Sequence, residues 1–126
     1  MEQFIPLEKL EVYQMARELS KIAWEIYEPM DWQTKKVIGD QFITATDSVS
    51  ANIAEGFGRF HYLDKMKFYY NGRGSLFEAK NWIEILLERK YITNEQQDKY
   101  RKIADTLGVK LNNLISVTYK TKKEEQ

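Results

Sequence analysis

The stretch that organises this chain runs from residue 48 to residue 59 and reads Ser48-Val49-Ser50-Ala51-Asn52-Ile53-Ala54-Glu55-Gly56-Phe57-Gly58-Arg59. Val49 and Ile53 are four residues apart, as on one face of an α-helix. Glycine just after the last periodic residue is typical of a helix end, because it adopts the left-handed backbone conformation without steric cost. We therefore expect this helix to end at Glu55 and Gly56 to open a Gly-Phe-Gly turn.

The acidic residue of this stretch is unusually placed. A carboxylate in a last helical turn faces the negative end of the helix dipole, which costs a few tenths of a kcal/mol up to about 1 kcal/mol unless a cation lies nearby. Arg59 and Arg73 are the candidate cations for Glu55. Residues that go against local preferences in this way usually have a structural or a functional reason.

Periodic apolar residues continue on both sides of this stretch. Four segments show helical spacing, with short breaks between them, and we expect helices over residues 7–27, 32–55, 62–90 and 94–119. Pro29 ends the first, because the residue before a proline is disfavoured in the α region, and Asp31 can cap the second. Thr93 and Gln96 form a capping box at the start of the fourth. The sequence therefore predicts an all-α fold, an antiparallel up-down-up-down four-helix bundle forming a single domain over residues 1–126.

The third segment contains two glycines, Gly72 and Gly74. Each glycine inside a helix costs about 1 kcal/mol relative to alanine. The apolar heptad phase is the same before and after them, so we expect an unbroken helix in which another backbone comes close, rather than a break.

Composition excludes several classes of protein. The chain has 126 residues, no cysteine and one histidine, His61, so a disulfide framework or a thiolate metal site cannot form. No apolar run reaches the length of about 20 residues that spans a bilayer, and residues 1–4 do not begin a secretion signal. We expect a cytoplasmic protein without membrane contact, cofactor or metal.

Charge is balanced overall but uneven along the chain. Residues 1–60 contain six basic and ten acidic side chains, a net of −4, and residues 61–126 contain thirteen basic and nine acidic, a net of +4. The basic half could form a face for nucleic acid or for an acidic partner. The simpler interpretation is that helix faces are solvated and the two halves attract each other.

Aromatic residues exceed what a closed bundle needs. Nine lie partly or wholly off the main apolar seams, namely Trp24, Tyr27, Trp32, Phe57, Phe60, Tyr62, Phe68, Trp82 and Tyr91. Exposed aromatics in this number indicate an interface, so we expect a homo-oligomer. The alternative is that some of them, Phe57, Phe60 and Tyr91 in particular, cover the ends of the bundle.

No enzyme motif is present, and the bundle di-metal pattern Glu-x-x-His does not occur. A cluster of polar residues remains around the second and third helices: Asn52, Glu55, Arg59, Arg73, Ser75 and Glu78. The favoured interpretation is a buried hydrogen-bond network that fixes helix register, with Arg73 paired to Glu55. The alternatives are a pocket or a partner-binding patch.

Two motifs resemble a known family. The first is the Ser48–Arg59 stretch, which matches the pattern S-x-S-x-N-I-A-E-G-x-G-R. The second reads Phe68-Tyr69-Tyr70-Asn71-Gly72-Arg73-Gly74-Ser75-Leu76-Phe77-Glu78 and is similar to F-x-x-x-A-R-G-S-L-x-E. Together they identify the chain as resembling the 23S rRNA intervening-sequence proteins.

The resemblance implies an antiparallel four-helix bundle that assembles into a ring, typically a homopentamer, in a bacterial protein. A related branch, the accessory protein of diversity-generating retroelements, partners a reverse transcriptase and binds nucleic acid. The resemblance transfers no catalytic residue. Many relatives carry paired arginines shortly after the glutamine of the second helix, whereas residues 41–46 of this chain contain none.

Three functions follow in order of preference. The first is a non-catalytic, ring-forming scaffold associated with structured RNA, a ribonucleoprotein or a nucleic-acid-processing protein, whose expected contacts are Arg59, Lys65, Lys67, Arg73 and Lys80. The second is a protein-interaction module that touches no nucleic acid. The third is an enzyme using Asn52, Glu55 and Arg73, which would require a cavity beside these residues.

Overall fold

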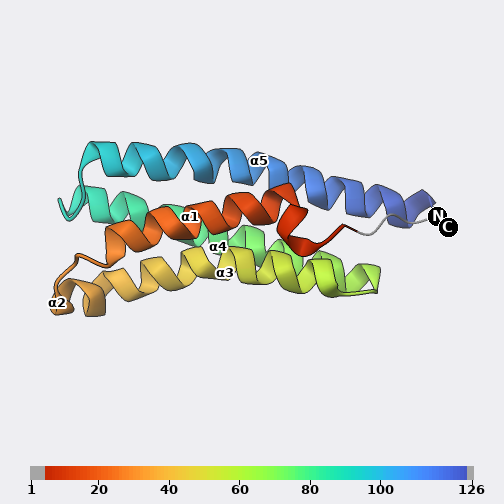
Figure 1. The fold of residues 1–126 in the computed structure, drawn as a ribbon, viewed down its shortest axis with the longest axis horizontal. Coiled ribbons are helices and arrows are strands. Elements are labelled where there is room, and N and C mark those ends of the chain that lie inside the picture. The colour runs from red at the N-terminus through yellow and green to blue at the C-terminus, as the bar shows by residue number, and fades with distance from the viewer. Residues whose placement is uncertain (1–4, 125–126) are drawn as a thin grey trace.

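The computed structural model describes residues 5–124, and for residues 122–124 the backbone alone. It is all-α (Figure 1). A 3₁₀ turn, η1 (Leu7–Lys9), precedes α1 (Glu11–Tyr27). The second long helix is continuous but consists of α2 (Trp32–Thr34), the π-helical turn η2 (Lys35–Gly39) and α3 (Asp40–Gly58). Helices α4 (Tyr62–Glu88) and α5 (Asn94–Glu124) complete the fold.

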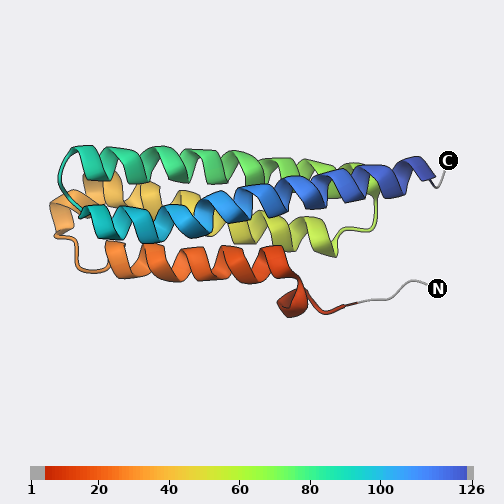
Figure 2. The same cartoon turned by 90° about the horizontal axis from the view of Figure 1, so that it is seen from above.

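The four long helices form the predicted antiparallel bundle (Figures 1 and 2). Helix α1 packs against α3 and α5, and α4 packs against the same two helices, so α1 and α4 lie on the diagonal. The bundle can be described as two layers. One layer is α1 with α3, the other is α4 with α5, and their outer surfaces are opposite sides of the molecule.

The core consists of the apolar seams read from the sequence. Leu19, Phe42, Ile53, Ile83 and Leu107, one or more from each long helix, are completely or almost completely buried. A single continuous hydrophobic cluster joins all four helices. Burial of this kind, rather than intrinsic propensity, holds long helices together in water.

Two predicted caps are confirmed, and several predicted boundaries shift. Asp31 accepts a hydrogen bond from the backbone N–H of Thr34 at 2.8 Å, and hydrogen bonding to Thr34 lowers the pKa of the Asp31 carboxyl. Thr93 and Gln96 bond reciprocally, at 3.1 Å and 2.9 Å. The first α-helix begins at Glu11 rather than at residue 7, because Leu10 is extended and interrupts the helical hydrogen bonds. Helix α4 ends at Glu88 rather than at residue 90, and α5 continues to Glu124 rather than ending at residue 119.

The prediction that Gly56 leaves the helix is wrong. No described glycine has a positive φ angle, and α3 continues through Gly56 to Gly58. Gly56 is buried, and a Cβ atom at its position would lie 2.6 Å from Cε1 of Tyr69. This glycine therefore allows the Tyr69 ring to pack on the α3 backbone.

The prediction for the third helix is confirmed, because α4 passes without a break through both of its glycines. A Cβ atom at Gly72 would lie 3.4 Å from Cβ of Asn52 and 3.6 Å from the carbonyl oxygen of Val49, so α3 is the backbone that comes close. Gly74 differs. A Cβ atom there would meet nothing within 4 Å.

Candidate nucleic-acid interface

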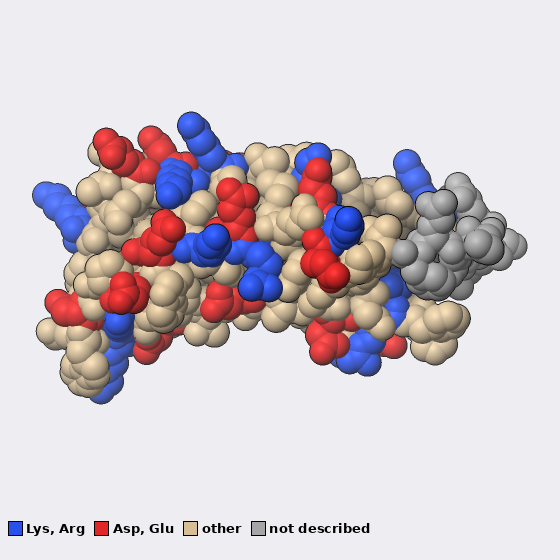
Figure 3. Space-filling view, in the orientation of Figure 1, with Lys and Arg blue, Asp and Glu red and all other residues tan. Residues whose placement is uncertain are grey.

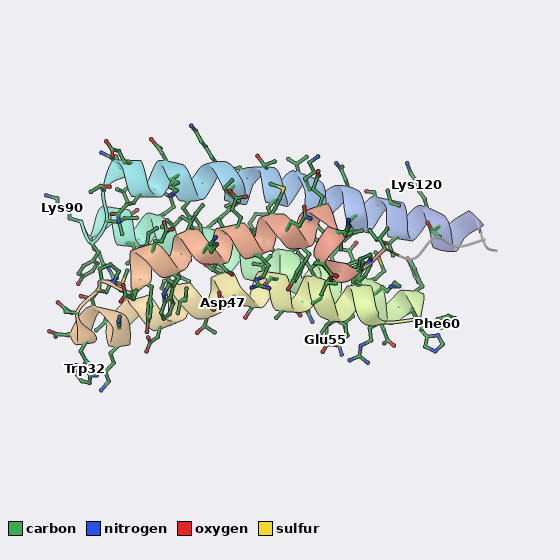
Figure 4. The ribbon with its side chains drawn as sticks, viewed as in Figure 1. Trp32, Asp47, Glu55, Phe60, Lys90 and Lys120 are labelled. Carbon is green, nitrogen blue, oxygen red and sulfur yellow. The ribbon has the colours of Figure 1, made fainter. Side chains whose placement is uncertain are left out.

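The connection between α3 and α4 presents an aromatic ring to solvent. Arg59, Phe60 and His61 link the two helices, and the Phe60 side chain is 90% exposed. The His61 ring meets the edge of Phe60 at 5.4 Å between centroids. Figure 4 shows Phe60 projecting from this end of the bundle. Phe60 therefore does not cover the core, and the end-covering alternative is wrong for this residue.

Two cations surround a second ring beside this connection. The guanidinium of Arg59 lies over the Phe68 ring at 4.9 Å, and Lys67 Nζ lies 5.7 Å from the centre of the same ring. Arg59 also pairs with Glu55, with 3.0 Å between Nη2 and Oε2. We call Arg59, Phe60, Lys67 and Phe68 the terminal cluster. It combines positive charge with flat apolar rings, the combination that binds unpaired nucleotides.

Lys65 has a structural task at the same end. Its Nζ donates to the carbonyl oxygens of Gly56 at 3.2 Å and of Phe57 at 3.0 Å. These are among the last carbonyls of α3, which have no i+4 partner within the helix, and the Gly56 carbonyl also accepts from the backbone N–H of Arg59 at 3.2 Å. A lysine at this point also neutralises the negative end of the helix dipole. Lys65, predicted as a nucleic-acid contact, is therefore placed as a cap of α3.

The C-terminal half of α5 lies at this same end. Figures 1 and 2 show α5 finishing near the α3–α4 connection, and Figure 4 shows Lys120 toward that end. The Lys120 side chain is exposed. Elsewhere the two signs of charge are mixed, as the face in Figure 3 shows.

The other two predicted contacts lie away from the terminal cluster. Arg73 and Lys80 line a small groove of about 190 Å³ between α4 and α5, on either side of the Phe77 ring. Lys80 pairs with Asp105 at 2.9 Å. Partial burial of the Asp105 carboxyl acts to raise its pKa, but hydrogen bonding and attraction to Lys80, with a smaller effect of Arg101, lower it on balance. Lys80 is thus engaged within the bundle.

The polar cluster around Asn52 does not form the expected network. Glu55 is exposed and pairs with Arg59, so the predicted pairing of Arg73 with Glu55 is wrong. The reason is the helix end. Because α3 continues to Gly58, Glu55 and Arg59 are one turn apart on its outer side, and Gly56 rather than Glu55 faces α4.

The remaining members of that cluster bond locally. Asn52 donates to the carbonyl oxygen of Ser48 at 2.8 Å, and Glu78 accepts from Nε1 of Trp82 at 3.0 Å. Ser75 is half-buried on α4. Over the described part of the chain, no three of the His, Asp and Glu residues come together as metal ligands. Nor is any helix in residues 5–124 long and apolar enough to cross a membrane.

The opposite end of the bundle carries a second basic and aromatic group, of which the sequence singled out the aromatic residues Tyr27 and Trp32 but not the lysines beside them. Lys36 Nζ lies 4.8 Å from the ring centre of Trp32, which is 74% exposed, and Lys35 lies at the same distance from Tyr27. All four lie around the π-helical turn or the chain that leads into it. The sequence does place two lysines one turn after a tryptophan. Helical periodicity alone predicts that such residues lie on an ordinary solvated face, so the pairing was not expected.

Comparison with known proteins agrees with the fold. The family model described as 23S rRNA-intervening sequence protein matches residues 8–113. A crystal structure of a protein with unknown function from the S23 ribosomal protein family of Bacteroides thetaiotaomicron VPI-5482 is similar, with a TM-score of 0.78 and 21% identity. The match covers 82% of this chain and 97% of that one. A search of curated proteins found no match.

Proposed function

The chain belongs to the 23S rRNA-intervening sequence protein family, and on this premise we propose that it is a non-catalytic, self-associating helical-bundle scaffold that binds structured RNA. The observation that carries the proposal is the terminal cluster. Arg59 and Lys67 on the Phe68 ring, with Phe60 beside them, offer stacking surfaces and positive charge in one place. Exposed loop bases are the part of a folded RNA that such a surface recognises.

The choice of RNA features follows from the geometry. A duplex offers phosphates but no free base faces, whereas a hairpin loop offers both. Phe60 is almost wholly exposed and so can stack on a base without any rearrangement of the bundle. Stacking on an aromatic side chain contributes about 1–3 kcal/mol per base. We therefore expect stem–loop RNA to bind better than the same stem without its loop.

The test is a binding titration with a fluorescein-labelled stem–loop RNA over a range of salt concentrations. The variant Arg59→Gln, Phe60→Ala, Lys67→Gln should bind at least about tenfold more weakly, since it loses a stacking ring and two cations. The slope of log affinity against log salt should also become shallower by about 1.5, which corresponds to two phosphate contacts. Lys102→Gln, which removes an exposed α5 cation outside the terminal cluster, is the matched control.

A second candidate function has support from the same contacts. Lys65, Lys80 and Arg59 each have a partner within the chain, which leaves fewer free cations than an RNA-binding face usually presents. This favours a protein-interaction module without nucleic-acid contact. Absence of stem–loop binding at low salt would reject the RNA proposal in its favour, as would equal losses in the triple variant and in Lys102→Gln.

A further inference from the structure

Helix α4 carries a second apolar line on the side away from its own core. Leu63, Tyr70 and Phe77 are seven residues apart and are 76%, 50% and 60% exposed. Gly74 lies between the last two and Lys67 between the first two, so the line repeats every three to four residues, as a helix-packing seam does, with one lysine in it. We call Leu63, Tyr70, Gly74 and Phe77 the α4 seam.

Gly74 is the residue that indicates that the seam is a contact surface. A glycine inside an exposed helix costs about 1 kcal/mol relative to alanine, and nothing in the bundle requires one here, because the space around a Cβ atom at this position is empty. Gly72, two residues earlier, shows the contrast, since α3 lies against it. A glycine flanked by exposed aromatics on a helix surface is suited to the close approach of another helix.

The opposite side of the molecule has a groove of matching kind. Between α1 and α3 lies a hollow of about 520 Å³. Its lining includes Trp24, Ile43 and Ser50, two carboxylates, Glu25 and Asp47, and two cations, Arg17 and Lys21. Trp24 is 54% exposed, and Ile43 is partly buried at the edge of the core. The hydroxyl of Ser20, which also lines this groove, is the buried side-chain polar atom without a hydrogen-bond partner among the described residues. Buried groups of this kind are normally satisfied in a completed structure.

Charge indicates what covers the two surfaces. The layer that contains the groove comes from residues 1–60, with a net charge of −4, and the layer that contains the seam comes from residues 61–126, with a net charge of +4. The groove itself carries both signs, since Arg17 and Lys21 line it beside Asp47. Within residues 5–124 none of these three, nor Arg73 beside the seam, takes part in an ion pair, so the difference in charge lies between the two layers as wholes. Opposite faces of opposite net charge attract when copies of one chain meet side to side.

We propose that the α4 seam of one copy packs into the α1/α3 groove of a second copy. This inference rests on the self-association in the proposed function and names the two surfaces that would make it. The contact joins different patches on the two copies, so it is heterologous, and repeating it forms a closed ring where the rotation permits. The seam contributes a ridge centred on Gly74, and the groove contributes two helices on which that ridge rests.

The absence of cysteine makes a disulfide test clean. Gly74→Cys places a thiol at the centre of the seam, where there is free space. Ser50→Cys and Ile43→Cys place one in the groove. Each variant is purified alone, mixed with a differently sized partner and oxidised. We expect disulfide-linked heterodimers in the mixture of seam and groove variants, and none from any variant alone. Gly74→Cys mixed with Thr106→Cys, an exposed α5 position, is the control and should not cross-link.

The cross-linking results, together with light scattering on the unmodified chain, distinguish the other outcomes. Cross-linking of Gly74→Cys with itself would overturn the proposal, since it shows α4 packing on α4. An oligomer that cross-links at neither groove position would overturn the assignment of surfaces and leave self-association standing. A monomer at all concentrations would reject both. Stem–loop RNA binding is measured separately, so its failure is distinguishable from each of these results.

Discussion

At the scale of single residues, Gly56 is the glycine at which the packing of α3 on α4 leaves least room for a side chain. A methyl group there would lie 2.6 Å and 2.7 Å from two carbons of the Tyr69 ring and 3.2 Å from the carbonyl oxygen of Lys65. Overpacking in Gly56→Ala should cost roughly 1–3 kcal/mol and the better helix propensity of alanine should offset about 1 kcal/mol of it, so we expect a net destabilisation of about 1 kcal/mol. Urea unfolding measures it. An unchanged or raised midpoint would show that Tyr69 moves aside without cost.

The buried pair Thr46 and Tyr100 gives a second residue-scale prediction. Their hydroxyl oxygens are 2.8 Å apart, and Thr46 also bonds to the carbonyl oxygen of Phe42 at 3.0 Å. Because the single hydroxyl proton of Thr46 goes to Phe42, Tyr100 donates to Thr46. Thr46→Val leaves that donor buried without an acceptor and should cost about 1–3 kcal/mol. Tyr100→Phe leaves Thr46 satisfied and should cost less.

Thermal or urea unfolding of the two single variants and the double variant checks this asymmetry. In the double variant no polar group is stranded, so its loss should be smaller than the sum of the two single losses. Strict additivity would contradict the interaction. Tyr100→Phe costing more than Thr46→Val would contradict the assignment of the donor.

The same tyrosines predict sensitivity to alkali. Burial raises the pKa of Tyr69 to about 12, and burial is also the main cause that raises the pKa of Tyr100. In the unfolded chain these phenols ionise near pH 10. Their contribution to stability is therefore complete below about pH 10 and is lost as the pH rises through the folded-state pKa values. In an ultraviolet titration of the eight tyrosines, we expect these two to ionise only with unfolding. Reversible ionisation of all eight in the folded state would contradict this.

At the scale of elements, the helix positions were predictable and the helix ends less so. Apolar spacing identified all four helices, because one face of each meets the core, and the side-chain caps at Asp31 and Thr93 were readable because they act within one turn. The end of α3 was not, since a tertiary contact with Tyr69 outweighs the local preference of Gly56. The π-helical turn at Lys35–Gly39 has no sequence signal that periodicity could detect.

The candidate site shows the same limit. Arg59 and Glu55 were correctly grouped, because residues four apart on one helix are neighbours whatever the rest of the fold does. Arg73 was wrongly added to that pair, since its direction depends on how α4 is rotated about its own axis. Whether Leu63, Tyr70 and Phe77 face solvent likewise depends on how α4 is rotated about its own axis. The line that they form becomes visible once the core side of α4 is known.

Gly74 leads to a prediction in which two measurements move in opposite directions. Gly74→Ala should stabilise the isolated bundle by about 1 kcal/mol, because alanine is the better helix former and no atom is displaced. The same methyl group should weaken self-association, because it separates the α4 seam from its partner helix. Denaturation at low protein concentration measures the first effect, and sedimentation equilibrium measures the second.

Gly58→Ala is the matched control for this prediction. Gly58 also lies in a helix, at the end of α3, and also has open space around its Cβ position, but it is outside the seam. It should leave association unchanged. If Gly74→Ala associates as strongly as the unmodified chain, close approach at Gly74 does not occur.

At the scale of the whole molecule, the proposed contact and the proposed RNA site do not compete for the centre of the bundle. The α1/α3 groove and the part of the α4 seam from Tyr70 to Phe77 are on its sides. The terminal cluster is at the end where α3 meets α4, which the seam reaches at Leu63 (Figures 1 and 4). Copies related by rotation about an axis along the bundle would place every terminal cluster on one rim. Each copy would then add an equivalent site at a fixed spacing, and the sites would bind one long RNA with a high effective concentration.

Disassembly should therefore weaken binding of a long RNA and leave binding of a short one unchanged. Phe77→Glu removes the seam's last aromatic ring and would bury a charge in an apolar contact, without changing Arg59, Phe60 or Lys67. We expect a monomer that binds a single stem–loop with unchanged affinity, but binds an RNA of several linked stem–loops about 100-fold more weakly or worse. Asn71→Glu adds the same charge at an exposed position of α4 off the seam, and should affect neither probe. Loss of single stem–loop binding in Phe77→Glu would place RNA contacts on the seam itself, and equal affinity for the long RNA would show that the copies bind independently.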